Sequence, residues 1–249
     1  MKTFLMADGA VGTQVFDYLC REFPRDLGFV ASAQENALLD AARTRGIPSA
    51  MFDPGEEFLA AVHAAGGEEG FNLGVLAWWP KIVKEPLLSL PKYGFLNFHP
   101  SYLPYNRGKH YNFWALVEQC PFGVTLHLVD SGVDTGPVVA QRILPYDWTD
   151  TGQTLYERAQ SEIVALFRDT YPSLRDEPVR GNPQNLDEGS FHRASELDPA
   201  SQIDLDTSYT ARDLFNRLRA RTFAGKPACC FTDHGHTFEV RVEIKKVES

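Results

Sequence analysis

Cysteine is scarce in this chain, and its cysteines form no recognisable metal or redox motif. Four cysteines occur among 249 residues, and no two of them make a C-x-x-C pair. No cysteine and histidine lie at the spacings typical of zinc sites. We therefore expect free thiols in a reducing cytoplasm and no metal cofactor.

Long apolar runs are absent as well. No stretch reaches about 18 consecutive apolar residues, the length that indicates a membrane-spanning helix. The first residues, MKTFLMADGAVG, have too short an apolar core for an export signal and are typical of a first β-strand. The sequence thus predicts a cytoplasmic protein that does not span a membrane.

Positive charge is also in short supply. The chain has 24 Lys and Arg residues against 33 Asp and Glu residues, a formal net charge of −9 at pH 7. Because proteins that grip RNA or DNA usually present a basic surface, this balance disfavours nucleic acid as a partner. The hydrophobic content of 43% is ordinary for a soluble protein, and the length suits one sizeable core with a small appendage.

Short apolar strands alternate with helical segments in the first part of the chain. The predicted strands cover residues 3–6, 27–31, 73–79, 95–99, 123–129 and 138–144, and predicted helices include 33–45 and 56–65. This alternation predicts an α/β fold with a Rossmann-like parallel sheet that helices cover on both faces. Ligands of such sheets bind beyond the carboxyl ends of the strands.

A long helix is predicted to close this part of the chain. Thr154-Leu155-Tyr156-Glu157 has the form of a capping box. The helix after it carries an apolar stripe made of Leu155, Ala159, Ile163, Leu166 and Phe167. We expect this domain to cover residues 1–170.

The composition changes at Tyr171, where a C-terminal arm, helix and hairpin (171–249) are predicted to begin. Up to about residue 206 the arm is rich in Pro, Gly, Asp, Asn and Ser, with a short strand expected around 190–193. A capped helix should start at Thr210, and residues 233–236 suggest a hairpin turn. The helix residues expected to face inward are Ala211, Leu214, Phe215 and Leu218. Because a lone hairpin is marginally stable in water, we expect a homodimer through the C-terminal region.

Three polar side chains stand at the ends of neighbouring predicted strands. Asn97 and His99 are two residues apart and therefore project from the same face of one strand. Asp134 lies in a glycine-punctuated turn that follows the strand 123–129. An amide, an imidazole and a carboxylate placed together would make a general acid/base site with an oxyanion donor.

These residues belong to a longer pattern that resembles the folate-dependent formyltransferase family. The pattern is N-x-H-P-S-x-L-P, then R-G, then G-V-T-x-H-x-V-D-x-G-x-D-x-G, over residues 97–136. The resemblance implies that Asn97, His99 and Asp134 act on the formyl group of 10-formyltetrahydrofolate. The form YNRGKHYNFW and the chain length are most similar to nucleotide-sugar N-formyltransferases. The implied acceptor is the amine of a nucleotide-linked amino-deoxysugar, such as a dTDP-amino-dideoxyhexose, for surface polysaccharides such as lipopolysaccharide O-antigen.

The resemblance also implies where folate binds. The family holds the pterin ring through main-chain groups, which can read its donor and acceptor edge. The matching residues are Pro80, Lys81, Val83, Val129, Asp130 and Ser131. Trp78 and Trp79, just before the first of these loops, are interpreted as core side chains.

Cations gather beside a predicted helix start. Arg107 and Lys109 precede the helix that begins near Tyr111, and helix amino ends favour anions. We interpret Arg107, Lys109 and Asn112 as contacts to the substrate's pyrophosphate, against the alternative of a solvated charged loop.

Other polar residues keep two interpretations each. His127, inside the strand 123–129, is either a hydrogen-bonded structural residue or a support for the site. Arg217, Arg219 and Arg221 on the C-terminal helix either face solvent or contact substrate or a second subunit.

Other functions remain open at this point. A glycinamide ribonucleotide enzyme would leave the last part of the chain unexplained, a methionyl-tRNA enzyme should carry a longer basic C-terminal domain, and a formate-releasing hydrolase should need a regulatory domain. A non-catalytic folate- or nucleotide-binding subunit would not need Asn97, His99 and Asp134 together. The nucleotide, the sugar and the choice between a C3 and a C4 amine are left open.

Replacing Lys109 or Arg107 with alanine should weaken acceptor binding and leave folate binding nearly unchanged. A charge-assisted hydrogen bond contributes about 1.5–3 kcal/mol, so the acceptor KM should rise roughly 10-fold or more. Steady-state kinetics with a nucleotide-sugar acceptor measure this change. An unchanged acceptor KM in both variants would remove this loop from the substrate site.

Overall fold

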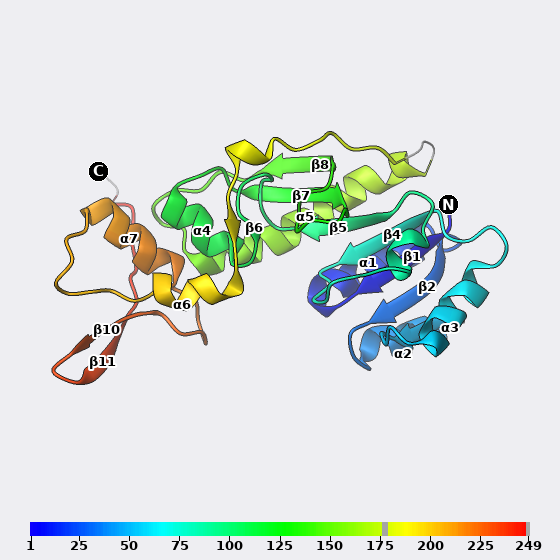
Figure 1. The fold of residues 1–249 in the computed structure, drawn as a ribbon, viewed down its shortest axis with the longest axis horizontal. Coiled ribbons are helices and arrows are strands. Elements are labelled where there is room, and N and C mark those ends of the chain that lie inside the picture. Colours follow the sequence, from blue (N-terminus) through cyan, green and yellow to red (C-terminus); the bar gives the residue numbers. More distant parts are fainter. Residues whose placement is uncertain (176–178, 248–249) are drawn as a thin grey trace.

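A seven-stranded sheet forms the centre of the protein (Figure 1). The computed structural model describes residues 1–175 and 179–247. The strand order is β3-β2-β1-β4-β5-β7-β8. The strands are β1 (Thr3–Ala7), β2 (Leu27–Ser32), β3 (Ser49–Met51), β4 (Leu73–Ala77), β5 (Phe95–His99), β7 (Gly123–Leu128) and β8 (Val138–Ile143).

The sheet is parallel from β3 to β5 and antiparallel from β5 to β8. The predicted α/β sheet is confirmed, but it is mixed and not wholly parallel. The connection from β7 to β8, residues 129–137, contains no helix. Parallel neighbours need a crossover of a dozen or more residues, so this short loop can join only antiparallel strands.

Helices cover the sheet, and shorter elements lie between its strands and after them. The helices are α1 (Gly9–Glu22), α2 (Ala37–Thr44), α3 (Glu56–Gly66), α4 (Tyr111–Glu118), α5 (Gly152–Leu174), α6 (Leu197–Ala200) and α7 (Ala211–Ala220). The 3-10 turns are η1 (Leu87–Ser89), η2 (Leu186–Glu188) and η3 (Ala194–Glu196). The short strands are β6 (Arg107–Gly108), β9 (Phe191–His192), β10 (Cys229–Asp233) and β11 (His236–Val240).

The two faces of the sheet have separate cores, as the alternation of strand side chains requires. In β1, Leu5 and Ala7 point into the larger core, which includes apolar residues of α1 and α5. Phe4 and Met6 point to the other face, into the core covered by α3. Helices on both faces are therefore confirmed. Among the described residues, no helix has the length and apolarity that crossing a bilayer requires.

Two predicted helix starts were wrong. The second helix begins at Ala37 and not at residue 33, because the side chain of Asn36 caps it by accepting from the N–H of Leu39. The capping box of α5 is formed by Thr151 and Thr154, whose hydroxyls each accept from the other's main-chain N–H. The predicted box at Thr154 thus lies one turn too late. The five residues of the predicted stripe are all buried.

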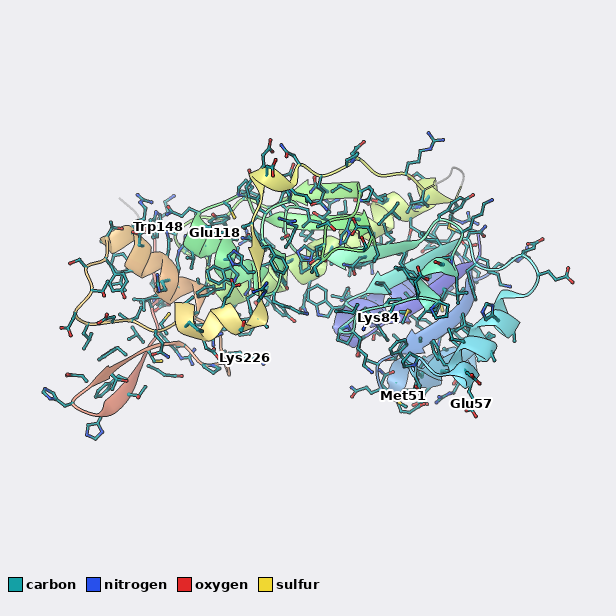
Figure 2. The ribbon with its side chains drawn as sticks, in the orientation of Figure 1. Met51, Glu57, Lys84, Glu118, Trp148 and Lys226 are labelled. Atoms are coloured by element: carbon teal, nitrogen blue, oxygen red, sulfur yellow. The ribbon has the colours of Figure 1, made fainter. Side chains whose placement is uncertain are left out.

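The C-terminal part packs at the end of the molecule away from β1–β3 (Figure 1). Helix α5 continues past residue 170 to Leu174, so the predicted composition boundary falls inside a helix. The cap at Thr210, the strand at 191–192 and the hairpin turn between β10 and β11 are confirmed. Figure 2 labels Trp148 beside α7, on this end of the protein.

The inward face of α7 differs from the prediction. Ala211 and Phe215 are exposed, whereas Leu218 is buried as predicted. Arg219 is buried as well, because its guanidinium donates to the main-chain oxygens of Asp147 and Asp150. Only 4% of Arg219 is exposed, so of the three arginines this one is a buried structural residue.

The carboxylate of Asp26 joins the far end of α5 to the sheet. It is 3% exposed and accepts hydrogen bonds from the Tyr171 hydroxyl at 3.0 Å and from Nε of Arg175 at 2.6 Å. The Tyr171 hydroxyl also bonds the Thr3 hydroxyl on β1 at 2.8 Å. One phenol oxygen thus satisfies two buried polar groups that are far apart in the sequence.

Tyr171→Phe should lower the free energy of unfolding by about 1–3 kcal/mol, because it leaves two buried partners with an unmade hydrogen bond. Urea unfolding measures the loss. Tyr93→Phe is the matched control, since within the described part of the chain no hydrogen bond to the Tyr93 hydroxyl is found. A loss no larger than that of the control would contradict the assignment.

Candidate active site

Asn97 and His99 lie at the carboxyl end of β5, beside the loop that carries Asp134. In the antiparallel pairing of β5 with β7, Asn97 lies opposite His127 and His99 opposite Thr125. The loop 129–137 then brings Asp134 back over these residues, with a left-handed φ of 54° at Asp134. The three side chains predicted to act together are therefore neighbours.

The Asp134 carboxylate is the centre of this cluster. Its Oδ2 accepts from the main-chain N–H of Gly108 at 2.9 Å and lies 3.4 Å from Nδ1 of His99. Its Oδ1 accepts from Nδ2 of Asn97 at 3.4 Å. Burial raises the pKa of Asp134. The neighbouring imidazoles, chiefly His99, and the Gly108 N–H lower it by a larger amount. The net shift is downward, so the carboxylate is charged at neutral pH.

The imidazole of His99 is enclosed and lies between two acceptors. Its Nε2 lies 3.2 Å from the main-chain oxygen of Asn106, and its Nδ1 faces Asp134. Only the protonated ring can donate to both. Burial nevertheless lowers the pKa of His99, and Asp134 offsets this only in part. At neutral pH the ring is therefore neutral, and it gains a second hydrogen bond when it takes up a proton.

The ring of Tyr111, at the start of α4, contributes to this enclosure. It meets the His99 ring edge-on with 6.1 Å between centroids, and it stacks on Tyr156 of α5. Tyr111 is thus one of the groups that bury the imidazole, and burial is the main cause of its lowered pKa.

His127 is part of the same cluster. Its Nδ1 lies 2.9 Å from the main-chain oxygen of Leu128, to which it donates. In the neutral ring, Nε2 is then free to accept from Nδ2 of Asn97 at 3.1 Å. The amide group of Asn97 is thus oriented by both His127 and Asp134. Of the two interpretations of His127, support for the site is the one that this geometry favours.

The contact between His127 and Asn97 could have been predicted from the sequence. Asn97 and His127 are directly paired across the strands, so an antiparallel register for β5 and β7 would have put their side chains together. The predicted sheet was parallel, and a parallel register does not place these two residues opposite each other. Gly108 was missed for another reason, since its contribution comes from its main chain.

The predicted substrate residues lie around the start of α4. Lys109 is exposed, and Arg107 is half-buried with Nε directed to the main-chain oxygen of Ser190 at 3.4 Å. Asn112 donates to the main-chain oxygen of Gly152 at 2.7 Å, which ties α4 to the start of α5. The two cations are open to a ligand, whereas the Asn112 amide already has a partner. Their roles in substrate binding stay predictions.

The predicted folate residues lie in two loops, one after β4 and one after β7, and Val83 and Val129 both pack in the smaller core. Pro80, Lys81, Asp130 and Ser131 are exposed and Val129 is half-buried. Val83 is 7% exposed and packs in the smaller core, so only its main chain can face a ligand. The role of these loops also stays a prediction.

The tryptophans before the first loop pack against the two cores, as interpreted from the sequence. Trp78 meets Tyr156, and Trp79 meets Phe52. Strand β4 ends at Ala77 and not at residue 79, because Trp78 has a left-handed φ of 60°. Within residues 1–175 and 179–247, no three His, Cys, Asp or Glu side chains gather as metal ligands would.

Two family models match the chain. The model described as formyl transferase matches residues 27–169, more than half of the sequence. A second model, described as an N-formyltransferase dimerization C-terminal domain, matches residues 196–246. The first match contains the whole cluster around Asp134.

Relatives with known names agree with the first match. A methionyl-tRNA formyltransferase from Thermodesulfovibrio yellowstonii is 29% identical over 59% of this chain and 47% of its own length. A dTDP-4-amino-4,6-dideoxyglucose formyltransferase from Mycobacterium tuberculosis is 28% identical over 60% of this chain and 64% of its own length. The match thus spans less than two-thirds of either relative.

A solved structure extends the similarity beyond these segments. It is the formyltransferase PseJ from Anoxybacillus kamchatkensis, in complex with UDP-4,6-dideoxy-4-formamido-L-AltNAc and tetrahydrofolate. The two chains are 28% identical and superpose with a TM-score of 0.59 over 80% of this chain and 89% of the other.

His99→Gln should make the free energy of unfolding less dependent on pH between about pH 7 and 5. Because burial lowers the pKa of His99 below its unfolded value of about 6.5, the folded wild type binds fewer protons there than the unfolded chain. Its stability therefore falls as the pH drops from about 6.5 through the folded pKa, by at most about 1.4 kcal/mol per pH unit from this group. Glutamine does not titrate and lacks this loss.

Urea unfolding of both proteins at pH 7 and pH 5 measures the difference. Burial also lowers the pKa of His110, but this residue is present in both proteins and cancels. A variant that loses as much stability in acid as the wild type would contradict the assignment.

Proposed function

The chain belongs to the formyl transferase family, and on that premise we propose that it transfers a formyl group from 10-formyltetrahydrofolate to the amine of a nucleotide-linked amino sugar. The observation that carries the proposal is the enclosed cluster of Asn97, His99 and Asp134 at the carboxyl end of β5. PseJ, which was solved with a formamido sugar nucleotide and tetrahydrofolate, supports this donor and this class of acceptor.

The reaction is an acyl transfer between two nitrogens. The neutral amine of the sugar attacks the formyl carbon, and the carbonyl oxygen becomes negative in a tetrahedral intermediate. The bond from carbon to N10 of the folate then breaks, and N10 keeps the electron pair. One proton leaves the attacking nitrogen and one is taken up by N10, so the products are a formamide and tetrahydrofolate.

His99 and Asp134 are suited to move that proton. The neutral imidazole gains a hydrogen bond when it accepts a proton, since both of its nitrogens face acceptors. The charged carboxylate of Asp134 stabilises the imidazolium that forms, and the same ring can pass the proton to N10.

Asn97 is suited to stabilise the negative oxygen. Its amide donates to Asp134 over 3.4 Å, which is long for a hydrogen bond, so this donor can turn to a stronger acceptor. The hydrogen bond to His127 keeps the amide nitrogen of Asn97, and not its oxygen, directed toward His127 and Asp134. An amide donor placed before the reaction begins stabilises the transition state without reorganisation.

We assign the folate to the two loops that follow β4 and β7. Main-chain groups of residues 80–83 and 129–131 would hold the pterin. The acceptor's pyrophosphate would meet Arg107 and Lys109, with Asn112 contributing if it exchanges its bond to Gly152. The net charge of −9 disfavours methionyl-tRNA as the acceptor, although one relative bears that name.

A homodimer, a cytoplasmic location and a role in surface polysaccharide synthesis go with this proposal. The match to a dimerization domain over residues 196–246 supports pairing through the C-terminal region. The β10–β11 hairpin offers an apolar contact, since Phe238 stacks on Phe231 and is 46% exposed.

Asn97→Ala and His99→Ala should bind folate but turn over slowly. Losing an oxyanion donor costs about 100- to 1,000-fold in kcat, and losing general-base help costs about 100- to 10,000-fold. The double variant should be far from additive, because the two groups act in one step. Activity should also fall in acid, where the acceptor amine is protonated and cannot attack.

Steady-state kinetics with 10-formyltetrahydrofolate and dTDP- or UDP-linked amino sugars make this test. His63→Ala, on the exposed side of α3, is the control and should keep wild-type kcat. If His99→Ala retains more than about a tenth of wild-type kcat, His99 takes no part in the chemistry.

A further inference from the structure

The segment that follows the catalytic domain returns across the loops that form the active site. This return segment, residues 182–193, runs back along β8 and then beside β6 (Figure 1, yellow). Asn182 exchanges two main-chain hydrogen bonds with Val138 at its start. The Gln184 amide donates to the main-chain oxygens of Asp134 and Gly136, at 2.9 and 2.7 Å. It therefore holds the loop that carries the central carboxylate.

The other end of the return segment holds Asn106, which is fully buried and has a left-handed φ of 54°. The Ser190 hydroxyl accepts from the main-chain N–H of Asn106 at 3.1 Å and donates to Glu118 at 2.8 Å. The Asn106 side-chain amide donates to the same Glu118 oxygen at 2.9 Å. Two side chains from distant parts of the sequence thus fix one residue of the site loop.

Glu118, at the end of α4, is the shared acceptor in this network (Figure 2). Its second oxygen lies 2.6 Å from Nε2 of His192, whose Nδ1 lies 3.0 Å from Glu196. Both imidazole nitrogens of His192 therefore face a carboxylate oxygen. The His192 ring also stacks on Trp114, with 3.8 Å between centroids.

The loop held in this way supplies both partners of the catalytic pair. The main-chain oxygen of Asn106 faces Nε2 of His99, and the main-chain N–H of Gly108 donates to Asp134. The strand pairing of β6 with β9 adds hydrogen bonds from Arg107 to Ser190 and from Lys109 to His192. A shift of residues 106–108 would therefore move His99 and Asp134 relative to each other.

We propose that Ser190, Glu118 and His192 are positioning residues for formyl transfer, which hold the Asn106 oxygen against His99 and the Gly108 N–H against Asp134. The kinetic part of this inference rests on the proposed function. If these three residues only tied the return segment to α4, replacing them would change the stability of the protein and leave the environment of His99 unchanged. The two cases differ in what happens to the imidazole.

The test uses Ser190→Ala and Glu118→Gln in the full chain. Ser161→Ala and Glu157→Gln are matched controls, because both residues are exposed on α5 and their hydrogen bonds stay within that helix. Glu118→Gln keeps one acceptor oxygen and is the milder change. We expect kcat to fall about 10- to 100-fold in both test variants, since displacing reacting groups by about 1 Å can cost that much. The KM for folate should stay within about threefold.

Nuclear magnetic resonance of the histidine side chains gives a readout that needs no activity. The ¹⁵N and ¹H signals of the His99 imidazole, identified by their loss in His99→Gln, should move in both test variants and stay fixed in both controls. Unmoved His99 signals in Ser190→Ala and Glu118→Gln would overturn the inference, as would wild-type kcat in an active enzyme. If the wild type transfers no formyl group to amino-sugar nucleotides, the proposed function fails, and the His99 signals alone decide the positioning role.

Discussion

A charged carboxylate that is largely shielded from water needs donors, and the site around Asp134 is arranged to supply them. Asn97 and His99 come from β5, and the Gly108 N–H comes from the loop that follows. An uncompensated buried charge would destabilise the fold, so these donors stabilise the carboxylate whatever part they take in the chemistry. The backbone at Asp134, whose carboxylate meets these donors, has a left-handed φ of 54°.

Burial and proton chemistry oppose each other at His99, and their balance makes the residue useful. Burial lowers the pKa of His99 and so favours the neutral ring, which has one N–H and can accept a proton. Asp134 and the Asn106 oxygen are both placed to accept, so a second N–H on the protonated ring would also find a partner. If the two acceptors were absent, protonation would leave a charge without a partner. In the proposed reaction, a base for the amine needs both conditions at once.

The sequence predicted which side chains come together better than it predicted the structure around them. Asn97 and His99 could be paired from a two-residue spacing on a strand, because strand periodicity is local. His127 and Gly108 could not be placed without the antiparallel register of β5 and β7 and the path of the loop back to Asp134. The prediction of the inward face of α7 was wrong for a similar reason. Arg219 is turned inward by main-chain oxygens of residues 147 and 150, which no periodicity within the helix reveals.

The return segment is a further case in which residues distant in the sequence determine the geometry of the site. All residues of the cluster around Asp134 lie within the match at residues 27–169, yet Gln184, Ser190 and His192 lie between that match and the one at 196–246. The motif therefore specifies which groups meet, while a segment outside both matches fixes how closely they meet. Since a displacement of about 1 Å changes rates by about 100-fold, that segment can alter the rate of an enzyme without altering any residue of its motif.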